Sequence, residues 1–244
     1  MGDASWLDVD RKMVEIALKR MEEYRSKEDQ DSFLRIAIAA GMRVALEGID
    51  GTGKTALSAA LRRQLRGRGY PVVPWKEPRD PYLASVAHRA TGGGRWEEAA
   101  LAFTLDRALA QGDLSRLLSH GRLVLSDRSL YSTLAYQVPF LDPPTRRRVV
   151  AWQEQLPHPP DRVLWLRLPV KEALARVSRR HRRRALWEVE RTLERAHRAY
   201  QALARRHPQT FRVVDASAPL REVVPAAAAH IEEAWRSRGR REVS

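Results

Sequence analysis

The stretch EGIDGTGKT, residues 47–55, decides the fold. Its last eight residues match the pattern G-x-x-x-x-G-K-[ST] of a phosphate-binding loop (P-loop). The apolar run RVALE, residues 43–47, predicts a strand before the loop, and a helix is predicted after it over residues 54–66. In that setting backbone N–H groups converge on phosphate oxygens at a helix N-terminus. The sequence therefore predicts a loop that binds a nucleoside triphosphate.

Two side chains of this loop have predicted roles of their own. Lys54 would reach the β- and γ-phosphates, and the Thr55 hydroxyl would bind Mg²⁺. The complete set of predicted triphosphate-binding residues is Gly48, Gly51, Thr52, Gly53, Lys54 and Thr55. The loop alone does not identify the acceptor of a transferred phosphoryl group.

Apolar runs and helical patterns alternate along the chain. Strands are predicted at residues 43–47, 71–75, 122–127, 162–168 and 211–215. Helices are predicted at residues 54–66 and 99–118, in two segments between 170 and 207, and near 220–238. Five short apolar strands that alternate with helices indicate an α/β fold of the P-loop NTPase type, with helices on both faces of a five-stranded parallel sheet.

The N-terminal part of the chain has a different pattern. Helical spacing over residues 7–25 and a second short helix ending near Gly41 predict a helical extension over residues 1–41. The P-loop domain would then occupy residues 42–244. We find no internal repeat and no segment that requires a second independent domain.

Composition excludes several classes of protein. The 244 residues contain no cysteine, which excludes disulfides and thiolate zinc sites. No apolar run approaches the ~20 residues that span a bilayer, and the charged N-terminus does not resemble a signal peptide, so a cytoplasmic location is expected. The net charge is +14, but arginine is spread along the whole chain, so dedicated nucleic-acid binding is not expected.

Several segments resemble the thymidylate kinase family, in the family's order. They are VALEGIDGTGKT (44–55), KEP (76–78), LAFTLDR (101–107), LVLSDRSLYSTLAYQ (123–137), PDRVLWLRLPVKEALAR (160–176) and VVDAS (213–217). The resemblance covers about residues 43–238 and implies a nucleoside monophosphate kinase that transfers the γ-phosphoryl group of ATP to dTMP with Mg²⁺. It also implies a homodimer and a lid at about residues 177–186.

The resemblance assigns acceptor-binding roles to individual residues. Phe103 would stack on the thymine ring, and Arg107, one helical turn later, would hydrogen-bond the base. Thr133 would make a second polar contact with the base, and Tyr136 would crowd the 2′ position of the sugar. The other implied acceptor-binding residues are Asp50, for the 3′-hydroxyl, and Lys76, Glu77, Arg128 and Gln137.

The implied catalytic residues are charged groups around the phosphates. Asp127, at the end of a predicted strand, would hold Mg²⁺, while Arg128 grips the acceptor phosphate. In the run SRRHRRR, residues 178–184, Arg180 and Arg183 would neutralise charge on the transferred phosphoryl group. With Lys54 these residues form the predicted catalytic set, and no general base is required because a phosphate acceptor is already anionic.

Two alternatives remain open, the first because the motifs depart from the family pattern and the second because of the N-terminal extension and the positive charge. Arg79 and Asp80 replace the usual glycines after KEP, and Ser129 stands where the family often has an aromatic residue. The first alternative is a P-loop kinase for another or modified pyrimidine deoxynucleotide, or for a deoxynucleoside, which would need a carboxylate base near the 5′-hydroxyl. The second is a nucleotide-binding or interaction protein without catalytic activity.

Overall fold

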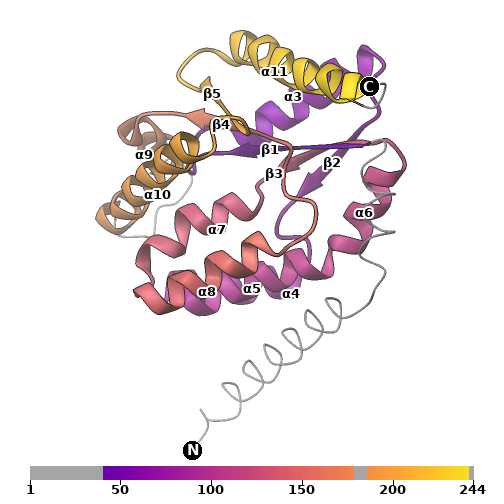
Figure 1. Ribbon diagram of the computed structural model, residues 1–244. Coiled ribbons are helices and arrows are strands. Elements are labelled where there is room, and N and C mark those ends of the chain that lie inside the picture. Colours follow the sequence, from indigo (N-terminus) through magenta and orange to yellow (C-terminus); the bar gives the residue numbers. More distant parts are fainter. Residues whose placement is uncertain (1–40, 179–185, 242–244) are drawn as a thin grey trace, which may run out of the picture.

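The computed structural model describes residues 41–178 and 186–241, arranged around one five-stranded sheet (Figure 1). The strands lie in the order β2-β3-β1-β4-β5, and each neighbouring pair is parallel. Their bounds are Met42–Glu47 (β1), Val72–Lys76 (β2), Leu123–Asp127 (β3), Arg162–Arg167 (β4) and Phe211–Asp215 (β5). The sheet confirms the predicted α/β fold. The predicted extension, up to residue 40, and the lid residues 179–185, with Arg180 and Arg183, lie outside the described residues.

The burial of each strand follows from its place in the sheet. Every residue of the central strands β1 and β3 is buried, whereas only two of the five residues of each outer strand, β2 and β5, are buried. Strands covered on both faces read as continuous apolar runs, which is why MRVALE and LVLSD stand out in the sequence. Pro74 lies in the outer strand β2, where a missing N–H donor costs least.

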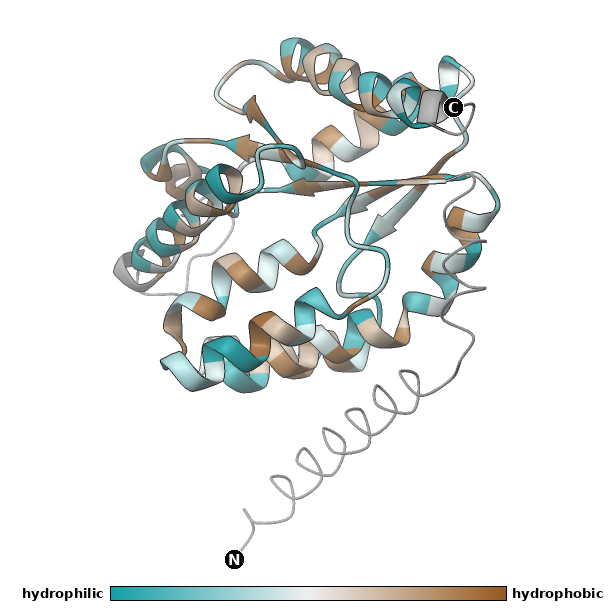
Figure 2. Ribbon diagram, viewed as in Figure 1, coloured by the Kyte–Doolittle hydropathy of each residue, from teal (hydrophilic) through white to brown (hydrophobic). Residues whose placement is uncertain are grey.

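Helices cover both faces of the sheet. Their bounds are Lys54–Gly67 (α3), Pro81–Gly92 (α4), Trp96–Leu109 (α5), Gln111–Ser119 (α6), Leu130–Tyr136 (α7), Pro143–Glu154 (α8), Val170–Ser178 (α9), Leu186–Arg206 (α10) and Leu220–Arg241 (α11), with a short 3₁₀ helix at Val138–Phe140 (η1). Helices α3 and α11 lie on one side, and α4, α5, α7 and α8 on the other (Figure 1). Brown apolar positions alternate with teal polar positions along these helices (Figure 2). Within the described ranges no helix combines the length and apolar character needed to cross a membrane.

Two features of the helices differ from the sequence prediction. The helix predicted over residues 99–118 is divided at Ala110 into α5 and α6. Three helices that the sequence analysis did not predict, α4, α7 and α8, connect the strands on the side of the sheet that carries α5. These additional helices bring further side chains to the region around Arg107.

The register of the strands aligns the residues that the motifs singled out. Asp127 lies opposite Leu46 of β1 and opposite Lys76 of β2. The carboxyl ends of β1, β2 and β3 therefore coincide at one edge of the sheet, where open α/β folds bind their ligands. The P-loop follows β1 at this edge, Glu77 follows β2 and Arg128 follows β3.

Candidate active site

The P-loop packs so closely against its neighbours that two of its positions require glycine. Gly48 has φ 146°, and a Cβ atom there would lie 2.7 Å from the carbonyl oxygen of Leu166 in β4. Gly51 has φ 93°, and a Cβ atom there would lie 2.5 Å from the carbonyl oxygen of Ala173 in α9. Side chains at these positions would clash with backbone atoms and would strain the main chain. The loop is thus pressed against both β4 and α9.

Lys54 begins α3 with its side chain buried inside the loop. Its Nζ donates to the carbonyl oxygens of Gly48 at 2.9 Å and Ile49 at 3.0 Å, and lies 3.9 Å from the Asp50 carboxylate. Burial, reinforced by the nearby positive charge of Arg128, lowers the pKa of Lys54 to about 8. The loop therefore holds an ammonium group whose charge depends on pH near the upper physiological range.

This shift predicts a change in stability with pH. The pKa of Lys54 lies below its ordinary value of 10.5, so the unfolded chain binds more protons between pH 8 and 10.5, and the free energy of unfolding should rise with pH there. Between pH 7.5 and 10.5 the wild type should gain about 3 kcal/mol relative to Lys54→Met, which cannot titrate. Urea unfolding of both proteins measures this difference. A constant difference would show that the pKa is not lowered.

Thr55 and Asp127 form an oxygen-rich pair beside the loop. The Thr55 hydroxyl donates to Oδ2 of Asp127 at 3.0 Å, and the Asp127 side chain is buried at the end of β3. No group of three or more acidic, histidine or cysteine ligands is found in the described part of the chain. Mg²⁺ is commonly held by one or two protein oxygens together with substrate phosphates, so this hydroxyl and carboxylate fit that ion.

Arg128 connects the end of β3 to the P-loop. Its guanidinium group forms an ion pair with the Asp50 carboxylate and donates to Ser132 Oγ at 3.2 Å. The Tyr136 hydroxyl accepts a hydrogen bond from the Asp50 N–H at 2.7 Å, and its ring centre lies 5.4 Å from the Arg128 guanidinium carbon. Burial raises the pKa of Tyr136, which keeps the hydroxyl neutral. The structure thus brings Asp50, Arg128 and Tyr136 together.

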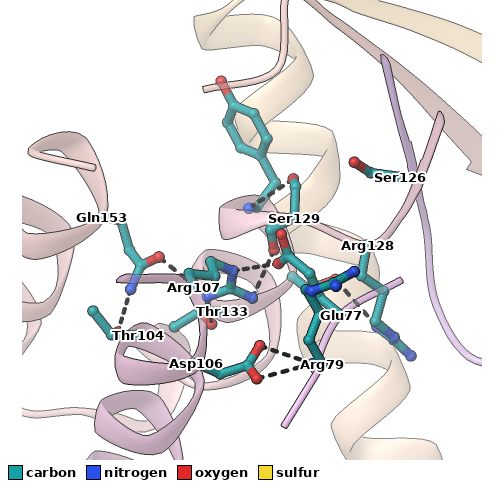
Figure 3. Close-up of polar contacts among 12 residues, drawn as sticks. Glu77, Arg79, Thr104, Asp106, Arg107, Ser126, Arg128, Ser129, Thr133 and Gln153 are labelled. Carbon is teal, nitrogen blue, oxygen red and sulfur yellow. Dashed lines mark hydrogen bonds and ion pairs between the residues drawn. The ribbon is translucent and has the colours of Figure 1, made fainter. Parts of the chain in front are cut away.

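Arg107 is buried and held by a dense set of polar contacts (Figure 3). Its Nε donates to Glu77 at 2.5 Å, and Nη1 donates to Thr133 Oγ1 at 2.8 Å and to Gln153 Oε1 at 3.2 Å. Its Nη2 donates to the Ser129 carbonyl oxygen at 2.8 Å. A guanidinium group has five N–H donors, so these contacts occupy four of them and leave one on Nη2.

The Glu77 carboxylate lies between two arginines, one of which the sequence analysis did not single out. Its Oε1 accepts from Arg43 Nη2 at 2.5 Å, while its Oε2 accepts from Arg107. Arg43 is a buried residue of β1 and also donates from Nε to Ser126 Oγ at 3.1 Å. Glu77 therefore fixes the Arg107 guanidinium group, and Arg43 fixes Glu77.

The remaining predicted acceptor residues lie around this network. Phe103 is half-buried on α5, one turn before Arg107, and its ring meets His88 of α4 edge-on with 5.9 Å between ring centres. His88 was not singled out from the sequence. Gln137 is buried at the end of α7, and Lys76 is exposed at the end of β2.

Asp106, next to Arg107 on α5, anchors the segment that departs from the family motif. Its carboxylate accepts hydrogen bonds from the backbone N–H group of Arg79, at 2.9 and 3.1 Å (Figure 3). It also accepts one from the backbone N–H group of Asp80, at 2.7 Å. Asp80 in turn caps α4 by accepting a hydrogen bond from the Leu83 N–H at 2.8 Å. The residues that replace the usual glycines therefore start a helix that is tied to α5.

The chain is similar in sequence to known thymidylate kinases over most of its length. A family model described as Thymidylate kinase matches residues 46–227. The chain is 35% identical to a thymidylate kinase of Desulfovibrio desulfuricans over 216 residues, which is 82% of this chain and 99% of that protein. It is 32% identical over 197 residues to a probable thymidylate kinase of Thermococcus onnurineus, covering 75% of this chain and 93% of that protein. The chain belongs to the thymidylate kinase family.

Proposed function

We propose that this protein transfers the γ-phosphoryl group of ATP to dTMP, giving dTDP and ADP. The observation that carries this proposal is the buried Arg107, held by four hydrogen bonds one helical turn from Phe103. The Ser129 carbonyl oxygen accepts a hydrogen bond from Arg107, and Ser129 directly follows Arg128. Arg128 in turn contacts Asp50 of the P-loop. An acceptor base bound at Arg107 would therefore have its 5′-phosphate directed toward the donor.

The hydrogen-bonding character of Arg107 favours thymine over cytosine. A guanidinium group is only a donor, and the N–H left on Nη2 can donate to the O4 carbonyl of thymine or uracil. Cytosine presents an amino group, also a donor, at that position. The Thr133 hydroxyl, which already accepts from Arg107, keeps a second lone pair for the N3–H of thymine.

Three acidic side chains at this edge of the sheet, Glu77, Asp50 and Asp127, argue against a deoxynucleoside acceptor. A nucleoside kinase needs a carboxylate base near the 5′-hydroxyl. Glu77 accepts hydrogen bonds from two arginines at 2.5 Å, Asp50 is paired with Arg128, and Asp127 accepts from Thr55. Carboxylates committed in this way suit a phosphate acceptor, which needs no base.

In the proposed reaction the protein positions phosphates and stabilises charge. An oxygen of the dTMP phosphate attacks the γ-phosphorus, and the bond to the β-phosphate oxygen breaks to release ADP. Lys54 would hold the donor phosphates, Arg128 the acceptor phosphate, and the lid residues Arg180 and Arg183 would act on the transferred group. Thr55 and Asp127 would hold Mg²⁺, which supplies further neutralisation of phosphate charge when bound.

A coupled assay of ADP release tests this function directly. With saturating ATP, the acceptors to compare are dTMP, dUMP, dCMP, dGMP and thymidine. We expect dTMP to have the highest kcat/KM and dCMP to be lower by about 10²-fold or more, because its amino group opposes Arg107. Preference for thymidine would support the deoxynucleoside alternative. The absence of turnover with every acceptor would favour the non-catalytic alternative.

Replacing Phe103 with alanine tests the stacking contact. Phe103→Ala should raise KM for dTMP by about 10-fold or more, with little change in KM for ATP, because a stacked aromatic contributes about 1–3 kcal/mol per base. Steady-state kinetics with each substrate varied in turn gives both values. Phe140→Ala is a matched control, since that ring stacks on Trp96 at 3.9 Å. Equal increases in both KM values would assign Phe103 to the core instead.

We also propose that the protein is a cytoplasmic homodimer. Two large apolar side chains, Tyr82 on α4 and Leu109 on α5, are 53% and 57% exposed on helices that pack against each other. Contiguous exposed apolar surface marks sites of protein–protein contact, and we infer that these two side chains belong to the dimer interface.

Light scattering should therefore give twice the chain mass of 27.9 kDa at micromolar concentration. Leu109→Glu should shift the protein toward the monomer, because a charge at an apolar interface is costly to bury. The control is Leu220→Glu, at a residue that is 45% exposed at the start of α11. A monomeric wild type, or equal effects of both substitutions, would contradict this interface.

A further inference from the structure

A buried carboxylate, Glu47, lies directly before the P-loop and is not assigned a role by the reaction described above. It is the last residue of β1 and is 0% exposed. Its Oε1 accepts from Ser129 Oγ, and its Oε2 accepts from Ser132 Oγ and from the Tyr200 hydroxyl, each at 2.7 Å. None of the ion pairs found among the described residues involves this carboxylate. Three neutral hydroxyl groups therefore stabilise its oxygens, and they come from the segment after β3, from α7 and from α10.

The segment that Glu47 holds includes the most unusual backbone of the site. Arg128 has φ 77°, in the left-handed region that disfavours residues with a side chain. Such conformations persist when surrounding contacts fix them, and they concentrate at functional sites. Here two consecutive residues of β1 provide those contacts: the Leu46 carbonyl oxygen accepts from the Arg128 N–H at 3.1 Å, and Glu47 accepts from the Ser129 hydroxyl.

Glu47 also determines the orientation of a hydroxyl that touches the Arg128 side chain. A serine hydroxyl has one hydrogen and two lone pairs. Because Ser132 donates its hydrogen to Glu47, a lone pair remains to accept from Arg128 Nη1 at 3.2 Å. The Tyr200 hydroxyl donates to the same Oε2 atom, and burial next to Glu47 raises the pKa of Tyr200, so this donor keeps its proton.

We propose that Glu47 is a positioning residue of the phosphoryl transfer: it fixes the backbone and the side-chain direction of Arg128 toward the acceptor phosphate, and Tyr200 orients its carboxylate. The inference rests on the proposed function for its effect on turnover. A purely structural role would affect the use of both substrates. The proposed role affects only the Arg128 guanidinium group, which faces the acceptor phosphate. Loss of Glu47 should therefore impair use of the acceptor more than use of ATP.

The isosteric variant Glu47→Gln is the sharpest test. Its amide replaces one acceptor oxygen with an N–H₂ donor, so at least one of the three hydroxyl donors meets another donor. We expect kcat/KM for dTMP to fall by about 10- to 100-fold, the effect of losing a hydrogen bond near a charged group, while KM for ATP stays within about twofold. The crystal structure of the variant should show Arg128 displaced from Ser132.

Tyr200→Phe keeps the test decisive if Glu47→Gln folds poorly, and a double variant checks the coupling between Glu47 and Arg128. Tyr200→Phe removes one hydroxyl donor and keeps the ring, and should show the same acceptor-specific effect at smaller size. Tyr131→Phe is the matched control, because its buried ring packs on Phe211 with 4.8 Å between ring centres and should leave activity unchanged. Glu47→Gln in an Arg128→Ala background should cause little further loss, since coupled residues are not additive.

The outcomes separate this inference from the proposed function. Additive losses in the double variant, or an unchanged Arg128 in the variant structure, would overturn the role of Glu47 even if dTMP is the substrate. A wild type that does not phosphorylate dTMP would instead contradict the proposed function. In that case the position of Arg128 in the Glu47→Gln structure still decides whether Glu47 fixes it.

Discussion

Replacing Lys54 with alanine is expected to lower kcat for dTMP phosphorylation by about 10³-fold, the upper end for loss of one preorganised group that stabilises transition-state charge. Lys54 is the P-loop cation, and its ammonium group already lies among the loop carbonyl oxygens, 2.9 Å from that of Gly48. Alanine would remove the positive charge from the donor phosphates without changing the strand that precedes the loop. Steady-state assays of ADP release measure the loss.

Binding of the acceptor dTMP provides the control for Lys54→Ala. Phe103 and Arg107 lie on α5, away from the P-loop in sequence and held by contacts that do not involve Lys54. Calorimetric binding of dTMP to Lys54→Ala should therefore remain within a few-fold of the wild type, and the protein should unfold cooperatively. Retained turnover would refute the assignment of the P-loop as the donor site.

Replacing Arg107 with methionine is expected to lower kcat/KM for dTMP by about 10²-fold or more, because the base would lose a charged hydrogen-bond donor inside a buried site. The preference for dTMP over dCMP should fall below about 10-fold, since the group that opposes the amino group of cytosine is gone. Methionine keeps much of the side-chain length, and Glu77 keeps Arg43 as a partner.

The matched control for Arg107→Met is Arg95→Met. Arg95 precedes α5, and its side chain is 54% exposed, with an ion pair to Glu98 at 3.2 Å. Exposed ion pairs of this kind contribute little, so kinetics and stability should be nearly unchanged. An Arg107→Met protein that still prefers dTMP strongly over dCMP would contradict the assignment of Arg107 as the reader of the base.

The sheet could be predicted closely from the sequence because its strands are short, buried and bounded by turns. The predicted strands at residues 122–127 and 211–215 correspond to Leu123–Asp127 and Phe211–Asp215. The prediction of the helices was less complete. Helix α7 is only seven residues long and nearly all of it is buried, so it has no apolar stripe to detect. Helices α4 and α8 did carry local signals, an Asp N-cap followed by proline, at Asp80 and Asp142.

The site could be predicted only where its residues lie in contiguous motifs. Asp127, Arg128 and Arg107 belong to such motifs. The first two lie at the expected edge of the sheet, and Arg107 contacts Glu77 and Ser129 there from α5. Arg43 contacts Glu77 from 34 residues away, and Tyr200 contacts Glu47 from 153 residues away. No local pattern marks partners separated by such distances, because only the order of the strands and the packing of α10 bring them together.

One binding measurement tests the central claim most directly, that two nucleotides occupy one site with their phosphates facing each other. The probe is a molecule in which adenosine and thymidine are joined 5′ to 5′ through five phosphates. We predict that one molecule binds per chain, that it competes with both ATP and dTMP, and that the analogue with adenosine at both ends binds at least about 10²-fold more weakly. Competition with only one of the two substrates, or equal affinity for the two analogues, would contradict the account.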